Sequence, residues 1–540
     1  MIKKRLQAIA RWLDRRPYAI YAAIALAAGA LFFWLQASGR FPDPDSFYHA
    51  RLAALIFERG PVHNFPWLAK TVFADYYVDH HFLYHVLLIP FVKLAPSLAA
   101  GARYSSIFFG VAAILAATLL LRRLGAGLLS FLVPVFLLFS SPLIFRLNLA
   151  KTPALSLIIL FLGFYAAARS RPLLLGFVAF AYVYLYDGWI ILLPAVAALI
   201  LADLLVPAEP GSATEERGWH WRHRLFGRRT GRLALATAAG IILGHVFNPY
   251  FPENLAFEWL HIVRIGLIGF KDTISVGAEW YPYNDLEIIA VTPTTFLIFL
   301  LGATGFLVAW LKSRESGRRL PRERTRDTLA LFIFAAIALV FAIRSKRNIE
   351  YFVPFAVLAG VSGLDLFRLA GGIAILKTAK PLFGKIGLAA VAVYLAIVTS
   401  SVALRDWRGV RSDFENGVPG TKYAGAVKWL DKNTPEGALV FHSDWDDFPY
   451  FFLQSAHNRW LVGLDPTFMY VKDRALFKEW VDITQSKIKD RLAERVSNDF
   501  GAEYAFVDTD HAELKKSFES DSRFRLQYND AEGTIFKITK

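Results

Sequence analysis

The chain has 540 residues, of which 55% are hydrophobic, and its mean hydropathy of +0.38 is too high for an ordinary soluble protein. Its formal net charge is +15, but Lys and Arg cluster between apolar runs, which is typical of cytoplasmic loops in membrane proteins and argues against nucleic-acid binding. The absence of cysteine excludes disulfides, thiolate metal sites and a cysteine nucleophile.

Apolar runs of about 16–22 residues recur along the chain, the length that a helix needs to cross the hydrocarbon core. The first run follows a basic N-terminus, is too long for a signal peptide and lacks a cleavage site. We therefore expect an uncleaved first helix with its N-terminus in the cytoplasm. About eleven spanning helices are expected by length, near residues 17–37, 101–121, 126–143, 153–168, 172–187, 189–206, 233–249, 287–311, 328–344, 349–369 and 386–404.

The connecting loops at 122–123, 169–171, 207–232, 312–327 and 370–385 are basic, which places them inside. Alternation then places two long loops outside, at 38–100 and 250–286, together with the tail. Residues 82–100 are apolar enough to span, but a span there would invert every later loop. We therefore predict that this segment lies in or along the membrane surface.

The sequence predicts two domains. Residues 1–404 form a transmembrane domain that carries the two external loops, and residues 405–540 form a small soluble extracytoplasmic α/β domain. In the tail, helical stretches at 421–433 and 486–500 alternate with strand-like runs. These runs are 438–441, 460–463, 504–507, 523–528 and 534–538.

The first external loop opens with a pair of carboxylates, Asp43 and Asp45, on either side of a proline. Such a compact, oxygen-rich corner is suited to Mg²⁺ or Mn²⁺. The alternative is a turn and helix cap, since Asp-Pro-Asp is also typical of a helix N-terminus.

The same loop ends in a cluster of imidazoles and one carboxylate, with Asp79, His80, His81 and His85 within seven positions. On a helix, His81 and His85 share one face, which is metal-ligand spacing. The alternative is that aromatic and His side chains simply lie in the headgroup belt.

The second external loop holds Glu279 among apolar and aromatic residues. A carboxylate next to the bilayer is costly unless it is paired or bound to a metal. A solvated loop glutamate is the alternative.

Several basic residues fall on the external side, where positive charge is otherwise scarce. Arg146 and Arg347 are candidates for bidentate phosphate binding. Lys151 and Lys346 fit headgroup snorkelling better.

In these features the chain resembles the C-type (GT-C) membrane glycosyltransferases, and most of all the catalytic subunit of oligosaccharyltransferases. The order and spacing of the similar motifs cover most of the chain. The matching segments are Asp43-Pro-Asp45-Ser-Phe-Tyr48, Gly125-Ala126-Gly127-Leu128-Leu129, Tyr186-Asp187-Gly188-Trp189, Ser275-Val276-Gly277-Ala278-Glu279, Arg347 with Tyr351-Phe-Val-Pro354, and Trp429 to Pro435.

The sequence departs from the family at two motifs. Where the family has a second acidic pair, this chain has Asn148-Leu-Ala-Lys151. Asp79, His80 or His81 are the candidate replacement ligands. The family's Trp-Trp-Asp-Tyr-Gly motif, which reads the glycosylation sequon, survives only as Trp445 and Asp446, so a protein sequon as acceptor is not implied.

The resemblance implies a mostly α membrane protein with a GT-C-like bundle and a small α/β domain. It implies transfer of a sugar or oligosaccharide from a polyprenyl phosphate or diphosphate to a protein, glycan or lipid acceptor outside the membrane. Asp43, Asp45 and Glu279 would be catalytic, Arg347 and Arg146 would bind phosphate, and Trp445 with Asp446 would bind the acceptor. The implied cofactor is a divalent metal, Mn²⁺ or Mg²⁺, held by Asp45 and Glu279 with His81 and Asp79.

A transporter or flippase of a lipid-linked or anionic substrate is the alternative function. It predicts ionisable residues at the bilayer midplane and symmetric repeats, whereas the polar clusters of this chain lie in external loops. A structural or sensory protein would leave both acidic loops without a role. The expected location is a bacterial inner membrane, with the tail in the periplasm and no nucleic-acid partner.

Overall fold

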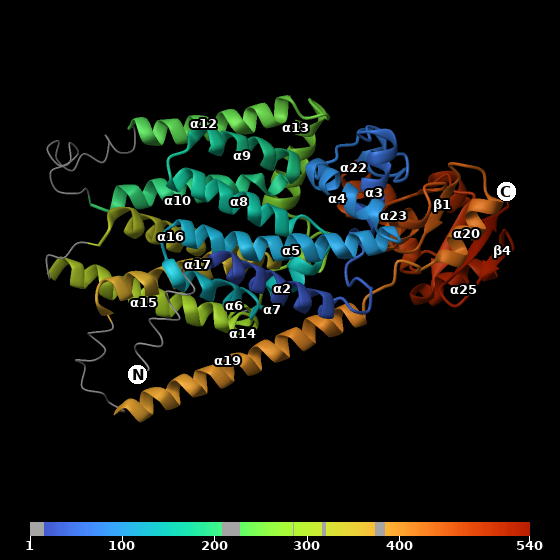
Figure 1. Ribbon diagram of the computed structural model, residues 1–540. Helices are drawn as coiled ribbons and strands as arrows, with labels where there is room; N and C mark the ends of the chain where they lie inside the picture. Colours follow the sequence, from blue (N-terminus) through green and yellow to red (C-terminus); the bar gives the residue numbers. More distant parts are fainter. Residues whose placement is uncertain (1–15, 208–226, 285, 316–319, 373–383, 540) are drawn as a thin grey trace.

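The computed structural model describes residues 16–207, 227–284, 286–315, 320–372 and 384–539, with the backbone alone for 384–392. The basic N-terminal segment 1–15 and most of the loop 207–232, both expected in the cytoplasm, lie outside the described residues. Long helices lie side by side in a bundle, and a small domain with a β-sheet lies beyond one end of it (Figure 1).

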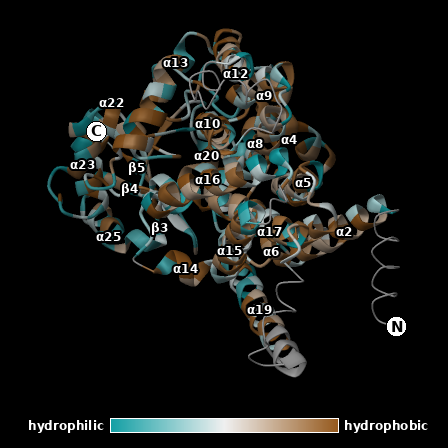
Figure 2. Cartoon of the chain, turned by 90° about the vertical axis from the view of Figure 1, so that its left-hand side faces the viewer, coloured by the Kyte–Doolittle hydropathy of each residue, from teal (hydrophilic) through white to brown (hydrophobic). Residues whose placement is uncertain are grey.

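The chain is an integral membrane protein. Among the described residues, six helices are long and apolar enough to cross a membrane, and a bent pair makes up to seven crossings. Hydrophobic residues run along the bundle helices, whereas hydrophilic residues gather in the C-terminal domain (Figure 2). The six segments are α2 (Pro17–Leu35), α5 (Leu98–Arg123), η3 with α10 (Asp187–Leu205), α15 (Pro293–Glu315), α16 (Arg322–Arg344) and η6 with α17 (Lys346–Leu369).

Three other expected spans coincide with helices that are shorter or less apolar, and the expected span at 386–404 lies within the 32-residue helix α19. Two of them, α8 and α9, belong to the bundle and contact each other, and α12 packs along α9. The last, α19, runs apart from the bundle toward the C-terminal domain (Figure 1). Their bounds are α8 (Pro153–Ala168), α9 (Pro172–Leu185), α12 (Arg228–Val246) and α19 (Gly384–Glu415).

The span expected as one helix at 126–143 is broken. Gly127–Leu137, which comprises η2 (Gly127–Leu132) and α6 (Val133–Leu137), meets α7 (Ser141–Asn148) at an angle of 80°. Ser140 has extended backbone, and Pro142 occupies the first turn of α7, where its missing N–H costs nothing. The break makes α7 a separate helix that carries Arg146 to the external cleft.

The external segments add short helices around that end of the bundle. Helix α4 has 13 residues, about 20 Å of helix, which is shorter than the hydrocarbon core. The end of the segment expected along the membrane surface, from Leu98, belongs to α5. The first segment expected outside the membrane contains α3 (Asp45–Arg59), η1 (Val72–Ala74) and α4 (Phe82–Leu94), and the second contains α13 (Glu253–Glu258), the π-helix η4 (Trp259–Ile268) and η5 (Ala278–Trp280). The short helix α14 (Glu287–Val291) follows the second segment, at the start of the span expected at 287–311.

The C-terminal domain is built on a five-stranded sheet in the order β2-β1-β3-β5-β4. The pairs β2–β1 and β1–β3 are parallel, and the pairs β3–β5 and β5–β4 are antiparallel. Four of the expected strands are present to within a residue or two, whereas the strand expected at 460–463 is reduced to Arg459–Trp460 and the helix expected at 486–500 is present only from Leu492 to Asp499. The strands are β1 (Leu439–His442), β2 (Arg459–Trp460), β3 (Tyr504–Asp508), β4 (Phe524–Asn529) and β5 (Gly533–Ile538).

One helix precedes the first strand, and short helices connect most of the strands that follow. They are α20 (Ala424–Asn433), η7 (Trp445–Asp447), α21 (Phe448–Gln454), α22 (Thr467–Lys472), α23 (Arg474–Thr484), α24 (Leu492–Glu494), η8 (Arg495–Asp499), η9 (Thr509–His511) and α25 (Ala512–Ser520).

The first external loop and the C-terminal domain share one apolar core. Helix α21 packs against α3, and the rings of Phe47 and Tyr450 lie 5.5 Å apart. Trp67 donates from Nε1 to the carbonyl oxygen of Ala456 at 2.7 Å, and Leu68 forms a β-bridge with Trp460. These contacts place η7 close to the N-terminus of α3, so that both line one cleft.

Helices α15 and α17 approach each other through glycines, as closely packed membrane helices do. A Cβ at Gly302 would overlap the backbone of Gly360. We expect Gly302→Ala to destabilise the protein by about 1–3 kcal/mol, because the helices must separate. The measurement is the midpoint of thermal unfolding in detergent, followed by tryptophan fluorescence.

The matched control is Gly409→Ala on α19, where an added Cβ meets no atom within 4 Å. This variant should unfold at or slightly above the wild-type temperature, because alanine favours a helix. Equal midpoints for both variants would contradict the close packing.

Candidate active site

Asp43 and Asp45 lie at the N-terminus of α3. Asp43 Oδ1 accepts a hydrogen bond from the backbone N–H of Asp45 at 3.0 Å, so the turn expected from Asp-Pro-Asp is present. The second oxygen of Asp43, Oδ2, points to Lys151. The motif therefore shapes the backbone and also presents charge to a neighbouring segment.

Lys151 joins the two carboxylates. Its Nζ lies 2.7 Å from Asp43 Oδ2 and 2.8 Å from Asp45 Oδ2, and its side chain is only 12% exposed. The snorkelling role considered for this lysine is therefore wrong. Burial opposes its charge, but Asp43 and Asp45 outweigh burial and raise the pKa of Lys151 above its usual value. Burial raises the pKa of Asp45 to about 6, although Lys151 lowers it.

Glu279, on η5, pairs with two arginines. Arg146 donates from Nη1 to Glu279 Oε2, and Arg347 Nη1 lies 3.6 Å from Oε1. Burial acts to raise the pKa of Glu279, but Arg146 and Arg347 outweigh it and hold the pKa well below its usual value. Arg146 is also fixed from the bundle, because Glu350 Oε2 accepts from its Nε at 2.8 Å.

The guanidinium of Arg347 lies close to two aromatic rings. Its guanidinium lies 4.8 Å from the ring centroid of Trp280 and 5.6 Å from that of Tyr186, and it donates to the Tyr186 hydroxyl. Such stacking orients a guanidinium at little cost in hydration. The guanidinium lines the cleft, where its charge faces an anion that enters.

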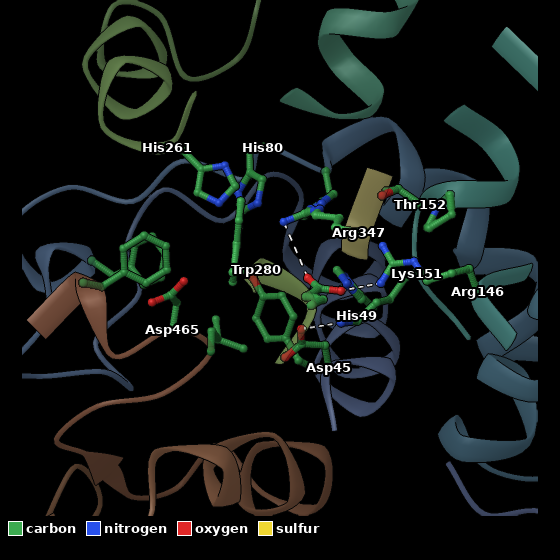
Figure 3. Close-up of a pocket in the computed structure, with 17 residues that line it drawn as sticks. Asp45, His49, His80, Arg146, Lys151, Thr152, His261, Trp280, Arg347 and Asp465 are labelled. Carbon is green, nitrogen blue, oxygen red and sulfur yellow. Dashed lines mark hydrogen bonds and ion pairs between the residues drawn. The ribbon is translucent and has the colours of Figure 1, made fainter. Parts of the chain in front are cut away.

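One cleft of about 420 Å³ brings these side chains together between the bundle and the C-terminal domain. Figure 3 shows Asp45, Lys151, Arg146 and Arg347 converging in an adjoining pocket, where Glu279 also lies. Every catalytic, phosphate-binding and acceptor-binding residue expected from the sequence lines the cleft: Asp43, Asp45, Glu279, Arg146, Arg347, Trp445 and Asp446.

Asp79 lies apart from this cleft. It is 2% exposed, and its Oδ2 is 2.8 Å from His85 Nδ1. His85 Nε2 in turn is 2.8 Å from Nδ1 of His49, which lines the adjoining pocket. Within the described residues, Asp79 therefore orients two histidines and does not converge with Asp45 and Glu279.

The surroundings of Asp45 and Glu279 do not fit the divalent metal expected there. Both carboxylates are engaged by buried cations, and Lys151 stands where the sequence lacks the second acidic pair. An ion between them would face Lys151, Arg146 and Arg347 without enough anionic ligands to offset the repulsion. A different group, His80, His81 and Asp187, has ligand atoms that all lie within 4.8 Å of one another and could hold a metal.

Sequence reasoning missed three parts of the site. Glu350 was not assigned a role, although a carboxylate at the start of an apolar helix is a signal of a buried pair. Asp187 and His261, which are hydrogen-bonded to each other, come from segments 74 positions apart. No local pattern could have joined them.

No protein-family model and no curated protein matches this sequence. Solved structures do match in fold. The archaeal oligosaccharyltransferase AglB from Archaeoglobus fulgidus, in complex with an inhibitory peptide and a dolichol-phosphate, has a TM-score of 0.61 at 15% identity over 97% of this chain and 75% of its own. ArnT from Cupriavidus metallidurans, bound to undecaprenyl phosphate, has a TM-score of 0.53 at 16% identity over 96% and 97%.

A third structure, the Archaeoglobus fulgidus oligosaccharyltransferase in complex with Zn and sulfate, has a TM-score of 0.55 at 14% identity over 95% and 73%. These likenesses confirm the expected fold class, a GT-C bundle followed by a small domain with a mixed sheet. At these identities they establish the fold and leave the reaction to be argued from the cleft.

The buried pair of Arg146 and Glu350 predicts a measurable stability effect. We expect Glu350→Gln to destabilise the protein by roughly 1.5–3 kcal/mol, because it weakens charged hydrogen bonds away from solvent. The unfolding midpoint in detergent is the measurement. The control is Glu287→Gln, whose pair with Lys346 is about one-third exposed and should contribute less than about 1 kcal/mol. Equal shifts would contradict a buried network.

Proposed function

We propose that this protein transfers a sugar or oligosaccharide from a polyprenyl phosphate or diphosphate carrier to an acceptor on the extracytoplasmic side of a bacterial inner membrane. The observation that carries the proposal is the convergence of Lys151, Arg146 and Arg347 with Asp45 in one cleft beside the bundle. A cleft of this kind suits a substrate whose phosphate stays at the membrane while its sugar reaches outward.

The fold neighbours support a lipid-linked donor. One was solved with a dolichol-phosphate and another with undecaprenyl phosphate. Charges concentrated beside the C-terminal domain favour a transferase over a transporter, whose site belongs near the bilayer midplane. Under this proposal, residues 1–404 form the membrane domain, residues 405–540 lie in the periplasm, and the N-terminus lies in the cytoplasm.

The cations stabilise the departing phosphate. As the bond between the sugar's anomeric carbon and the phosphate oxygen breaks, negative charge grows on that oxygen. Arg347, stacked on Trp280, and the ammonium of Lys151 are pre-oriented to receive it. Arg146 keeps Glu279 in place beside them.

Asp45 removes the acceptor's proton. A new bond forms between the acceptor's nucleophilic atom and the anomeric carbon, the proton passes to Asp45, and the carrier phosphate leaves with the bonding electrons. A carboxylate with a pKa of about 6 is ionised at neutral pH and is a stronger base than an ordinary aspartate. Trp445 and Asp446 border the cleft from the C-terminal domain and contact the acceptor.

Only part of a sequon-reading motif remains in η7, so the acceptor class stays open between a protein and an envelope glycan or lipid. Within this proposal, no step passes through a metal at Asp45 and Glu279. Lys151, Arg146 and Arg347 supply the positive charge that such an ion would otherwise bring.

The experiment that tests the proposal measures transfer of label from a radiolabelled polyprenyl-linked sugar pool to acceptors in membranes. We expect Asp45→Asn to lower the rate by about 10²-fold or more, which is the usual contribution of a general base. Lys151→Met should lower it by about 10²-fold or more because the leaving phosphate loses a charge partner, and Lys151→Arg should retain part of the activity.

The matched control is Lys472→Met, which removes a partly exposed ion pair with Asp75 outside the cleft and should leave transfer unchanged. Protease sensitivity of the labelled product identifies a protein acceptor. Full activity of Asp45→Asn at equal protein abundance would remove Asp45 as the base and with it the proposed mechanism.

The pKa of Asp45 predicts how the initial rate of transfer depends on pH. Above about 6 the carboxylate is ionised and can accept a proton, and below it the protonated form cannot. We expect the initial rate to fall about tenfold per pH unit below this value and to level off above it. The groups that set this pKa are Lys151, Asp43 and Glu279. A rate that is constant from pH 5 to pH 7 would contradict the assignment.

A further inference from the structure

A second group of polar side chains lies at or beside the opposite wall of the pocket that adjoins the cleft, which we call the inner pocket. His80 and His81 precede α4, Asp187 begins η3, and His261 belongs to the π-helix η4. Figure 3 shows the imidazoles of His80 and His261 side by side, across the pocket from Asp45 and Lys151. Three separate segments of the chain therefore contribute to one cluster that the proposed transfer does not use.

The geometry of the cluster is close to that of a metal site. One ligand atom each from His80, His81 and Asp187 lies within 4.8 Å of the other two. Ligands on a tetrahedral zinc ion stand about 3.3 Å apart, given bonds of about 2.0–2.1 Å. Binding one ion would draw the three atoms closer together, and the rings of His80 and His81 are already 3.9 Å apart between centroids.

One imidazole nitrogen of the cluster has no hydrogen-bond partner among the described residues. Nδ1 of His81 is buried and has no hydrogen-bond partner, which is uncommon for a buried polar atom. An imidazole nitrogen without a hydrogen-bond partner can serve as a metal ligand.

Asp187 is oriented from its other side. His261 Nδ1 and Asp187 Oδ2 form a hydrogen bond, and the ring of His261 lies 5.1 Å from that of His80 between centroids. Metal ligands are commonly held by such an outer hydrogen-bond partner, which fixes the direction of the ligand atom. The cluster thus has three ligands and a group that positions one of them.

We propose that His80, His81 and Asp187 bind one Zn²⁺ ion and that His261 positions Asp187. Two imidazole nitrogens and one carboxylate oxygen suit zinc better than the hard ions Mg²⁺ and Mn²⁺. His80 and His81 line the inner pocket, so the fourth coordination position faces that pocket. The ion joins the first external loop to the start of the span at Asp187.

This site differs from the metal centre expected from the sequence, which combined His81 with Asp45, Glu279 and Asp79. Asp45 and Glu279 lie with Lys151 and the arginines, and Asp79 is committed to His85. The two arrangements predict different losses of metal on mutation. They can be separated without any measurement of sugar transfer.

The experiment measures zinc by inductively coupled plasma mass spectrometry on the full-length protein, purified in detergent, supplied with Zn²⁺ and freed of excess. We expect about one zinc per chain for the wild type, consistent with a three-ligand site. His80→Ala, His81→Ala and Asp187→Asn should each lose most of it. Asp45→Asn and Glu279→Gln should keep it.

Zinc that stays bound to the histidine variants, or that is lost from Asp45→Asn and Glu279→Gln, would overturn the proposal, as would a wild type that binds none. His81→Gln, which is closer to histidine in size, serves as a second variant, and thermal unfolding midpoints show which variants remain folded. Replacement by Co²⁺ should give visible d–d absorption in the wild type that disappears in His81→Gln. These readouts stand even if the proposed transfer fails.

Discussion

The site depends on the balance of charge in a partly buried cleft. The negative charges of Asp43, Asp45 and Glu279 are stable in this cleft because Lys151 and the arginines pair with them. Each ion pair costs desolvation of both partners, which the attraction between them must repay. In the proposed reaction, a phosphate that enters this cleft meets cations that the carboxylates already orient.

The architecture makes this balance possible by collecting charges from segments that are far apart. The broken span turns α7 so that Arg146 meets Glu350 at the start of α17 and Glu279 on the second external loop. The C-terminal domain packs on α3 through aromatic rings and places Trp445 at the rim. A change in any one of these packings would shift a charge relative to its partner.

The inner pocket separates two kinds of chemistry. One wall carries Lys151 and the carboxylates, which suit proton transfer and the binding of an anion. The other carries imidazoles, with Asp187 beside them, and this group suits a borderline metal. A family pattern alone would merge the two, because it expects one metal shell at the carboxylates.

The sequence by itself determined the apolar helices of the bundle, four of the strands of the tail and seven side chains that line the cleft, because apolar runs, strand alternation and charges next to a bilayer follow from local composition. It did not determine the break before α7 or the role of Lys151. A lone lysine between two spans looks the same whether it reaches a headgroup or a carboxylate 108 positions earlier. Only tertiary packing decides this, since the partner of a charge is set by distance in space and not along the chain.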